Sequence, residues 1–379
     1  VITETTFGAV VCSIGGVGCP ASDCFCSSNY WGYHYWDGGA WQGYMVGAAS
    51  SVITNGAVEG WRWGPFGGTL LFPDLPPAPP IMAAASALEW LRPRQVITDG
   101  GYGSMGSTVE TLLAVGANGL RAADWKRQPD SASLLSYAMG NGAAYAGTGA
   151  DASAKLASGL SATDGCWPLN ALRPMDFYSS TTGAFRGAYG VGSGPQAWAI
   201  LGTRSFSQSV PVTAVQYLRS AQQPNGGWEW QAGFGSDTNS TALALQALVS
   251  IGEPVTSSAI ISGLAFLKSA QNADGGFTYD PASPWGTASD TNSTAYVVQS
   301  LLAVGHDPIT GIWAVTGSHP ISYLMGMQLP DGSFEYQKGL GTNQVATQQA
   351  IPALLGRPFP LTVADLTQCR GVFMPIVLR

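Results

Sequence analysis

The chain of 379 residues carries 16 Lys and Arg against 23 Asp and Glu, which gives a formal net charge of −7 at pH 7. Hydrophobic residues make up 45% and charged residues only 10%, so we expect a large core and a surface built from uncharged polar and aromatic side chains. The lack of a basic run argues against nucleic acid as a partner, and no apolar run approaches the roughly 18 residues of a membrane span.

Residues 1–72 are rich in Gly, Trp and Tyr and show no helical period. Aromatic residues alternate around Asp37-Gly38-Gly39, which predicts a hairpin, and Asn55-Gly56 predicts a second turn between two strands. We therefore expect a small β domain over residues 1–72. Its aromatic side chains either pack a thin core or form a sugar-binding platform.

Six cysteines indicate disulfide bonds rather than a zinc site, because the cluster near the N-terminus lacks a clean pair of C-x2-C arms. Disulfides in turn predict an extracellular location, secreted or at the cell surface, and sequence alone does not determine their pairing. Because the chain begins at Val1, we expect that a targeting segment or more was removed before it. The candidate disulfide residues are Cys12, Cys19, Cys24, Cys26, Cys166 and Cys369.

Residues 73–85 form a Pro-rich segment, PDLPPAPPIMAAA, that predicts an extended linker. Beyond it the chain changes to amphipathic helices and repeats itself. The clearest copies are YLRSAQQPNGGW at 217–228, FLKSAQNADGGF at 266–277 and YLMGMQLPDGSF at 323–334, with a fourth at 90–102. Each copy precedes a second helix, and residues 130–206 hold two blurred copies.

About six helix pairs are therefore predicted over residues 86–357, closed into a ring with one helix of each pair inside and one outside. Gln222, Gln271 and Gln328 are expected to bond the open backbone at a helix end. The Gly that follows each of them permits a positive φ, and the next aromatic side chain fills the gap between pairs. Residues 358–379 remain as an extended C-terminal tail.

The pattern aromatic-Leu-x3-Gln-x3-Gly-x-aromatic resembles the repeat of the squalene cyclase and prenyltransferase superfamily. The resemblance is clearest over residues 211–357 and implies a mainly α fold, the α/α toroid or (α/α)6 barrel. STALALQAL at 240–248 and the β domain are also similar to the cobalamin carriers transcobalamin and intrinsic factor. In those carriers the β domain follows the toroid, and its first strand and helix have no counterpart before Val1.

The heptapeptide SDTNSTA occurs twice, at 236–242 and 289–295. Its acids, Asp237 and Asp290, precede helices and are predicted to cap them, and Asn343 takes the equivalent place in the last copy. No D-x-D-D motif, the acid that the resemblance to squalene cyclases would require, is present. The spacing of Cys166, His306 and His319 does not support a prenyltransferase zinc site, so we predict no catalytic residue and no metal.

These observations favour a secreted, non-catalytic structural or interaction protein that assembles into an extracellular filament by exchange of a strand or tail between subunits. We expect a homo-oligomer formed through the β domain and the C-terminal tail, although the tail could instead fold back on its own toroid. The assembly residues would be Val372, Phe373, Ile376, Val377 and Leu378.

A carrier of a cobalamin-like small molecule is the first alternative, with its ligand held between the rim of the toroid and the β domain; otherwise no cofactor is expected. A terpenoid cyclase-like or glycan-active enzyme is the second, and the missing acid motif argues against it. The predicted ligand-binding residues are Asp237, Asn239, Asp290, Asn292, Asn343, Gln344, Trp228, Trp230, Phe277 and Tyr279.

Overall fold

The computed structural model describes residues 2–5, 8–14, 17–37, 40–44, 59–66, 80–284, 286–362 and 366–369. The chain divides into two compact units, Val1–Pro76 and Pro77–Arg379. Helix α1 (Pro80–Leu91) begins inside the segment that was predicted to be an extended linker. Proline is tolerated in the first turn of a helix, and the alanines that follow are strong helix formers whose side chains pack into the core.

The first unit is made of short antiparallel strands. Two pairs stand apart from the main sheet: β1 (Ile2–Thr5) with β2 (Gly8–Val11), and β3 (Ser13–Ile14) with β4 (Val17–Gly18). The main sheet has the order β6 (Trp41–Gly43), β5 (Asn29–Trp36), β7 (Glu59–Pro65). The β5–β6 pair lies at the predicted hairpin, where the Asp37 amide donates to the Ala40 carbonyl at 3.1 Å. The predicted Asn55-Gly56 turn lies outside the described residues.

Disulfides and stacked rings hold this β unit together. Cys12–Cys24 and Cys19–Cys26 are bonded, which confirms the predicted disulfides in the N-terminal region. On the main sheet the Tyr33 ring stacks on Tyr44 and Trp61, with centroids 4.5 and 4.6 Å away. The aromatic side chains thus pack largely against one another, as expected for a unit with too few residues to build a deep core.

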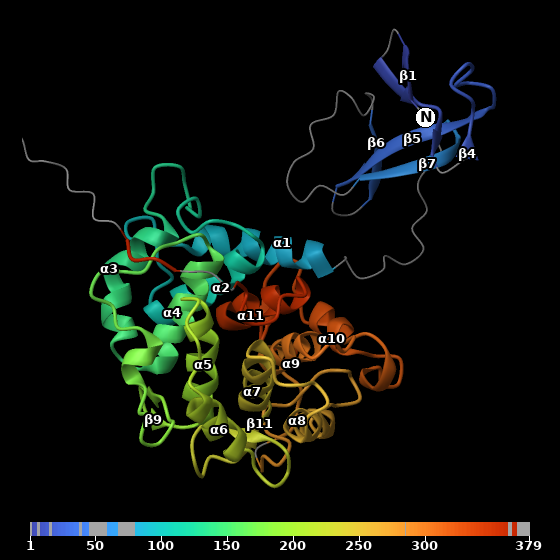
Figure 1. The fold of residues 1–379 in the computed structure, drawn as a ribbon. Coiled ribbons are helices and arrows are strands. Elements are labelled where there is room, and N and C mark those ends of the chain that lie inside the picture. Colours follow the sequence, from blue (N-terminus) through green and yellow to red (C-terminus); the bar gives the residue numbers. More distant parts are fainter. Residues whose placement is uncertain are drawn as a thin grey trace, which may run out of the picture. The chain divides into compact units, whose positions relative to one another are not determined.

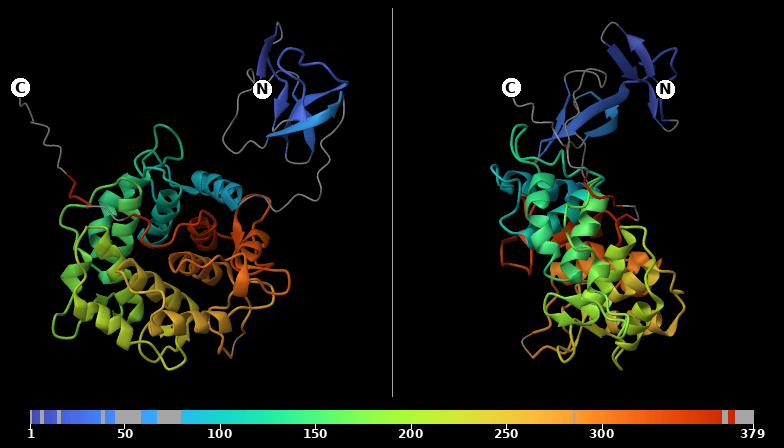
Figure 2. Two further views of the ribbon diagram at one scale, coloured as in Figure 1. Left: turned by 45° about the vertical axis from the view of Figure 1, so that its right-hand side comes forward. Right: turned by 60° about the vertical axis from the view of Figure 1, so that its left-hand side comes forward.

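The second unit is an α/α toroid (Figures 1 and 2), as the repeats predict. Within residues 80–284 and 286–354, six helices pack side by side in a closed inner ring, and the last returns to the first. In order around the ring they are α2 (Met105–Ala117), α4 (Ala150–Ala162), α5 (Ser193–Arg204), α7 (Thr238–Ser250), α9 (Thr291–Ala303) and α11 (Gln344–Leu354).

An outer layer surrounds the inner ring. It consists of α1, α3 (Leu134–Ala146), α6 (Val212–Ser220), α8 (Ser258–Ser269), α10 (Pro320–Gly326) and short 3-10 helices, η2 (Arg92–Arg94), η3 (Pro174–Phe177) and η4 (Gly311–Trp313). The first of the two blurred copies in residues 130–206 forms a regular helix pair, α3 with α4. In the other copy η3 occupies the outer position beside α5, because a Pro-containing stretch too short for an α-helix precedes that inner helix.

Short two-stranded ribbons precede three inner helices. They are β8 (Arg186–Gly187) with β9 (Gly190–Val191), β10 (Trp228–Glu229) with β11 (Ser236–Asp237), and β12 (Phe334–Glu335) with β13 (Thr342–Asn343). In the two later ribbons, one Glu carboxylate accepts from two glycine amides of the connecting loop. The ribbons place these loops around the N-terminal ends of the inner helices.

The repeated glutamine joins neighbouring repeats. The Gln222 carboxamide donates to the Gly226 carbonyl of its own turn at 2.8 Å and to the Ala259 carbonyl of the next outer helix at 2.9 Å. Gly226 has φ +88°, as predicted, and a Cβ there would lie 2.4 Å from the Ser262 carbonyl oxygen. The glutamine therefore bonds a turn and a second helix, rather than only the end of its own helix.

Gln328 makes the same two bonds where the ring closes. Its carboxamide donates to the Gly332 carbonyl at 3.0 Å and to the Ala83 carbonyl of α1 at 2.8 Å. The indole of Trp90 strengthens the closure by donating to Asp331 Oδ2 at 2.8 Å. The last outer helix is thus bonded to the first, although the two lie far apart in the sequence.

A Gln328→Leu substitution is expected to lower the free energy of unfolding by about 2 kcal/mol, because two partly buried carbonyls lose their donor. Urea unfolding of the full chain measures this change. Gln337→Leu is the control, since Gln337 makes a single long bond of 3.5 Å to Ala288. Equal stability of the Gln328 variant and the natural chain would contradict this role in closure.

The heptapeptide SDTNSTA connects repeats through its threonines. Thr241 Oγ1 donates to the Asp237 carbonyl at 2.7 Å and accepts from the amide of Trp228 at 2.9 Å. Thr238 Oγ1 donates to the Thr278 carbonyl of the following repeat at 2.6 Å. The second copy repeats both contacts, so the motif recurs because adjacent repeats must be joined in the same way.

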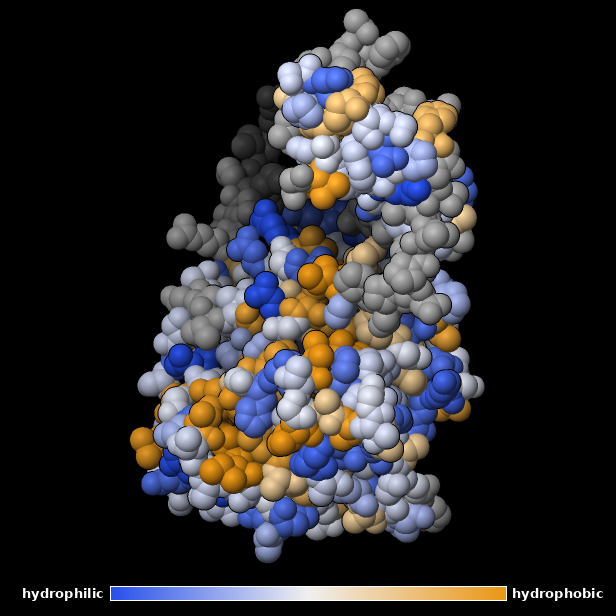
Figure 3. Space-filling model, turned by 90° about the vertical axis from the view of Figure 1, so that its right-hand side faces the viewer, coloured by the Kyte–Doolittle hydropathy of each residue, from blue (hydrophilic) through white to orange (hydrophobic). Residues whose placement is uncertain are grey.

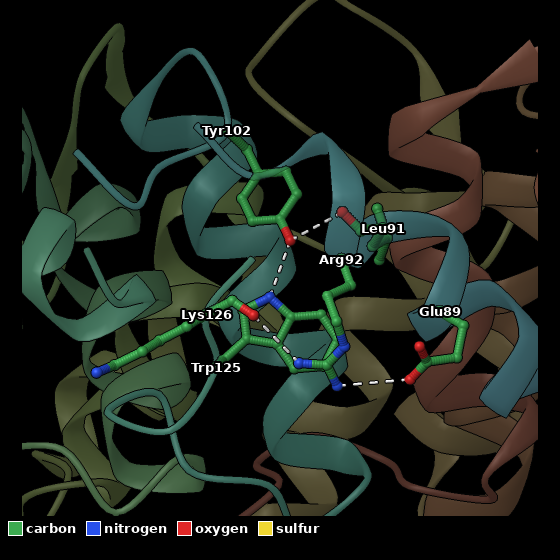
Figure 4. Close-up of polar contacts among 6 residues, drawn as sticks. All are labelled: Glu89, Leu91, Arg92, Tyr102, Trp125 and Lys126. Atoms are coloured by element: carbon green, nitrogen blue, oxygen red, sulfur yellow. Dashed lines mark hydrogen bonds and ion pairs between the residues drawn. The ribbon is translucent and has the colours of Figure 1, made fainter. Parts of the chain in front are cut away.

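The first repeat uses a tyrosine in the position of Trp228 (Figure 4). The Tyr102 hydroxyl donates to the Leu91 carbonyl at 3.1 Å and accepts from the Trp125 indole at 2.9 Å. Arg92 lies over the Trp125 ring, 4.1 Å from its centroid, and donates to the Lys126 carbonyl. This repeat thus fills the same gap with a polar ring and satisfies its hydroxyl internally.

The described part of the C-terminal segment lies on its own toroid. The Leu366 amide donates to the Ser205 carbonyl, the Cys369 amide donates to Trp167, and Cys369 is bonded to Cys166. The predicted assembly residues, Val372, Phe373, Ile376, Val377 and Leu378, lie outside the described residues. Up to Cys369, the tail therefore follows the alternative in which it folds back.

On the face shown in Figure 3, hydrophobic groups reach the surface between hydrophilic ones. This agrees with the low content of charged residues in the chain. Among the described residues, every helix is too short or too polar to cross a lipid bilayer.

Candidate active site

Equivalent positions of the six inner helices lie at the same level around the centre of the ring. The sixth residue of each forms a layer, here called the middle layer. In ring order it consists of Glu110, Lys155, Trp198, Leu243, Tyr296 and Gln349. Equivalent positions face inward because each helix begins at the same end of the ring and its side chains repeat every 3.6 residues.

A cavity of about 230 Å³ lies at this layer. Five residues of the middle layer line it, together with side chains nearer the N-terminal ends of the inner helices. The lining residues are Lys155, Trp198, Trp230, Asp237, Asn239, Leu243, Tyr279, Asn292, Tyr296 and Gln349. Glu110 joins them through an ion pair with Lys155 at 2.9 Å.

Asp237 is the acid of this cavity. It is the N-cap of α7, where Oδ1 accepts from the Ser240 amide at 2.7 Å, as its position before a helix predicts. Its side chain is buried, and within the described residues Oδ2 has no hydrogen-bond partner. Burial raises the pKa of Asp237 to about 6, against hydrogen bonds from Ser240 that act to lower it. One oxygen therefore holds the helix, while the carboxyl also lines the cavity beside the Tyr279 hydroxyl.

Asp290 occupies the equivalent position but differs in its second oxygen. Oδ1 accepts from the Ser293 amide at 2.7 Å, and Oδ2 accepts from the Ser293 hydroxyl at 2.8 Å. Burial raises its pKa to about 6 as well. Because both oxygens are engaged by its own helix and the residue does not line the cavity, Asp290 is a cap.

The two raised pKa values predict a pH dependence of stability. Free aspartate has a pKa near 3.9, so between about pH 4 and 6 the folded chain binds protons that the unfolded chain releases. The free energy of unfolding should therefore fall as pH rises through this window, by up to about 3 kcal/mol per carboxyl. Urea unfolding of the natural chain and of Asp237→Asn/Asp290→Asn at several pH values tests this. The free energy of unfolding of the variant, relative to that of the natural chain, should increase as pH rises from about 4 to 6. A constant difference would contradict it.

Lys155 and Glu110 form the ionic part of the site. Burial acts to lower the pKa of Lys155, but the charge of Glu110 and the nearby Tyr296 and Tyr145 outweigh it and raise that pKa above its usual value. The ammonium also lies 5.0 Å from the centroid of the Trp198 ring. Lys155 therefore stays charged in the cavity, balanced by one carboxylate.

Phe359 lies at the far side of the middle layer. Its ring packs against Trp198 and Tyr296, with centroids 5.1 and 6.4 Å away, and its amide donates to Gln246 Oε1 at 2.8 Å. Gln299 donates to the Arg357 carbonyl at 2.8 Å. Gln246 and Gln299 lie one turn further along their helices than Leu243 and Tyr296. The segment after α11 thus forms the floor of the cavity.

The structure brings five of the predicted ligand-binding residues together around the cavity: Asp237, Asn239, Asn292, Trp230 and Tyr279. Asn343 and Gln344 instead hold α11, by capping it and by bonding the Ser107 hydroxyl of α2. Trp228 and Phe277 are wrong as cavity walls. Both side chains are fully buried in the hydrophobic core. The backbone amides of Trp228 and Phe277 donate to the hydroxyls of Thr241 and Thr294, which holds the two residues in this position.

Sequence reasoning missed the middle layer, namely Glu110, Lys155, Trp198, Leu243, Tyr296 and Gln349. A signal existed in the later repeats, because counting six residues on from Asp237, Asp290 and Asn343 gives Leu243, Tyr296 and Gln349. The earlier inner helices are preceded by Ser104, Gly149 and Gly192, which carry no shared motif.

Residues 196–347 match the family model of the squalene-hopene cyclase C-terminal domain. This stretch contains Asp237 and the aromatic part of the cavity, whereas Glu110, Lys155 and Gln349 lie outside it. The match confirms the predicted resemblance to the squalene cyclase and prenyltransferase superfamily. A search of curated proteins finds no match.

Solved structures share the toroid. A variant of the type II terpene cyclase MstE from Scytonema, in complex with geranylgeranyl dihydroxybenzoate, aligns with a TM-score of 0.50 at 14% identity, covering 72% of this chain and 96% of that one. The apo form of MstE gives 0.48 at 14% identity, with 74% and 98% covered. A protein from Actinoplanes gives 0.47 at 15% identity, with 73% and 98% covered. At these identities the likeness shows the fold alone.

The prediction of a non-catalytic protein that assembles into filaments is wrong. The matched model describes a cyclase domain, and this match favours the enzyme alternative. The expectation that the chain is not an enzyme loses its support for the same reason. Neither the family model nor these neighbours bear on the predicted likeness of the β domain to cobalamin carriers, which stays a prediction.

Proposed function

We propose that the toroid is a terpenoid cyclase-like enzyme that starts ring formation by protonating an alkene with Asp237. The observation that carries this proposal is the buried carboxyl of Asp237 in the wall of the cavity, whose Oδ2 finds no well-formed hydrogen bond within the described residues. A pKa of about 6 keeps a substantial fraction of the carboxyl protonated near neutral pH, which a general acid requires.

The aromatic wall supplies what a carbocation needs. When Asp237 donates its proton, the electron pair of one alkene forms the new C–H bond, and positive charge appears on the neighbouring carbon. Trp198, Trp230 and Tyr296 line the cavity, and their π electrons would stabilise such a charge. A second alkene of the same substrate then closes the ring, and loss of a proton restores a neutral product.

The carboxylate left on Asp237 is stabilised locally. The Ser240 amide bonds Oδ1, and the N-terminus of α7 favours negative charge at this position. Burial first, and then the charge of Asp237, raise the pKa of Tyr279, so that this hydroxyl remains a neutral neighbour. Tyr279 is half exposed, which gives the site a side open to solvent from which Asp237 is reprotonated.

The other predicted functions find less support in this geometry. A glycosidase needs two carboxyl groups that face one cleft, and Asp290 is fully engaged by its own helix. A corrinoid is far larger than a cavity of about 230 Å³, so a cobalamin-like carrier would have to hold its ligand outside the cavity.

Reaction in heavy water tests the proposed function. The natural chain is incubated in D2O with isoprenoids of increasing length, and products are separated by gas chromatography and mass spectrometry. A cyclic isomer of the substrate that carries one deuterium is the expected result, because the initiating proton comes from solvent by way of Asp237. Recovery of every substrate unchanged would contradict the proposal.

Location and self-association remain proposals. The bonded cysteines of both units support an oxidising, extracellular compartment. Native material run with and without reductant would show the disulfides by a change in mobility, and light scattering would measure whether the chain self-associates.

A further inference from the structure

The middle layer of the cavity is divided into two halves. Trp198, Leu243 and Tyr296 come from α5, α7 and α9, which are consecutive in the ring. Gln349, Glu110 and Lys155 come from α11, α2 and α4, which are consecutive as well. One wall is therefore aromatic and aliphatic, and the facing wall is polar and ionic.

The cavity carries hydrogen-bonding capacity that the described residues leave unused. Oxygen atoms of Asn239, Asn292 and Gln349 are buried and have no partner among them. Gln349 belongs to the polar half, whereas Asn239 and Asn292 lie near the N-terminal ends of α7 and α9, the helices that carry Leu243 and Tyr296. Lys155 Nζ donates one hydrogen bond to Glu110 Oε1 at 2.9 Å, and its ammonium has two further N–H donors. A pure hydrocarbon would bury these groups without replacing their bonds, whereas a ligand hydroxyl both donates to an amide oxygen and accepts from an ammonium.

The size of the cavity limits the ligand. A cavity of about 150 Å³ accommodates one benzene molecule, so by proportion the volume of about 230 Å³ corresponds to about ten carbon atoms. Phe359 packs behind Trp198 and Tyr296 and supports this side of the cavity. Two isoprene units fit the space, and a triterpene does not.

The charge balance selects a neutral head group. Glu110 already neutralises Lys155, so an anionic head would add an uncompensated negative charge beside Asp237 and Glu110. A hydroxyl brings no charge and matches the unpartnered amide oxygens. The polar half of the middle layer lies outside the residues that match the cyclase model.

We propose that the cavity binds a short isoprenoid alcohol of about ten carbons, with its hydroxyl between Lys155 and the Gln349 carboxamide of the polar half and its chain against the aromatic side chains. This inference rests on the proposed function, since it names the substrate class of the same site. The hydroxyl orients the chain and places its alkene next to Asp237.

Binding to the full chain tests the proposal without turnover. Isothermal titration calorimetry of Asp237→Asn compares geraniol with myrcene, a hydrocarbon of equal carbon count, with farnesol, one isoprene unit longer, and with geranic acid. Geraniol should bind at least about tenfold tighter than each of the others. Myrcene lacks the hydroxyl that the site is built for, farnesol exceeds the volume of the cavity, and geranic acid brings an uncompensated negative charge. Equal binding of myrcene, tighter binding of farnesol or geranic acid, or binding of none of the probes would overturn the proposal.

Two variants show which residues make the distinction. Gln349→Leu, and separately Glu110→Leu/Lys155→Met, should reduce the preference for geraniol over myrcene to about twofold or less, with myrcene bound no more weakly. An unchanged preference in both variants would assign the discrimination elsewhere and overturn the role given to the polar half. Circular dichroism of each variant confirms that it is folded.

The proposed function and this inference fail separately. If the Asp237→Asn chain prefers geraniol but the natural chain yields no cyclic product in D2O, the inference stands and the cyclase function fails. If cyclic products form from hydrocarbons while geraniol has no advantage in binding, the function stands and the inference fails.

Discussion

Asp237→Asn is expected to lower ring formation by at least about 100-fold while leaving the fold intact, because it removes the proton donor but keeps a capping oxygen. The chain itself shows that Asn serves as this cap, since Asn343 Oδ1 accepts from the Ala346 amide at the start of α11. At pH 7 the variant should be at least as stable as the natural chain, because it no longer buries an ionised carboxyl. Product formation and urea unfolding measure the two effects.

Asp290→Asn is the matched control for this prediction. The two acids occupy equivalent places in SDTNSTA, and both have a pKa raised to about 6 by burial. They differ in Oδ2, which in Asp237 finds no well-formed hydrogen bond within the described residues and in Asp290 is bonded to Ser293. Ring formation should therefore persist in Asp290→Asn. Equal loss of activity in both variants would show that the effect is structural and would contradict the assignment of Asp237.

Glu110→Leu is expected to lower the free energy of unfolding by about 3 to 5 kcal/mol, because it leaves Lys155 charged and unpaired inside the toroid. Apolar replacement of the whole pair, in Glu110→Leu/Lys155→Met, should restore most of the loss, since no charge then remains to be buried. Urea unfolding of the two variants and the natural chain measures this. Equal stability of the single and double variants would show that Lys155 reaches water and does not depend on Glu110.

The fold was predictable because its repeats are defined by local chemistry. The spacing from Gln222 to Gly226 to Trp228 recurs wherever a turn must be bonded to the next outer helix, and that recurrence shows in the sequence. The helix starts at Asp237 and Asp290 were equally visible, since capping depends on a single residue and its immediate neighbours. The outer element beside α5 was harder to predict, because the 3-10 helix η3 replaces the expected α-helix there.

The cavity was only partly predictable, because its residues come from six separate helices. Asn239 and Asn292 were found through the duplicated motif, whereas Lys155 and Trp198 lie on helices whose starts carry no common signature. Burial of Trp228 and Phe277 could not be distinguished from cavity lining, since the repeat requires an aromatic residue there in either case. The acid was predicted as a cap and as a ligand-binding residue, but not as a catalytic group. What separates Asp237 from Asp290 is the bonding of Oδ2, which depends on the orientation of a serine hydroxyl.

The floor formed by Phe359 has a kinetic consequence. Among the described residues, the segment after α11 packs against Trp198, Gln246 and Gln299, whereas Tyr279 at the cavity is half exposed. Under the proposed function, we therefore expect substrate and product to use the same side of the site, beside Tyr279. A product must leave before the next substrate can bind, and the two exclude each other. Accumulating product should therefore act as a competitive inhibitor, and its departure rather than the chemical step would then limit the rate of turnover.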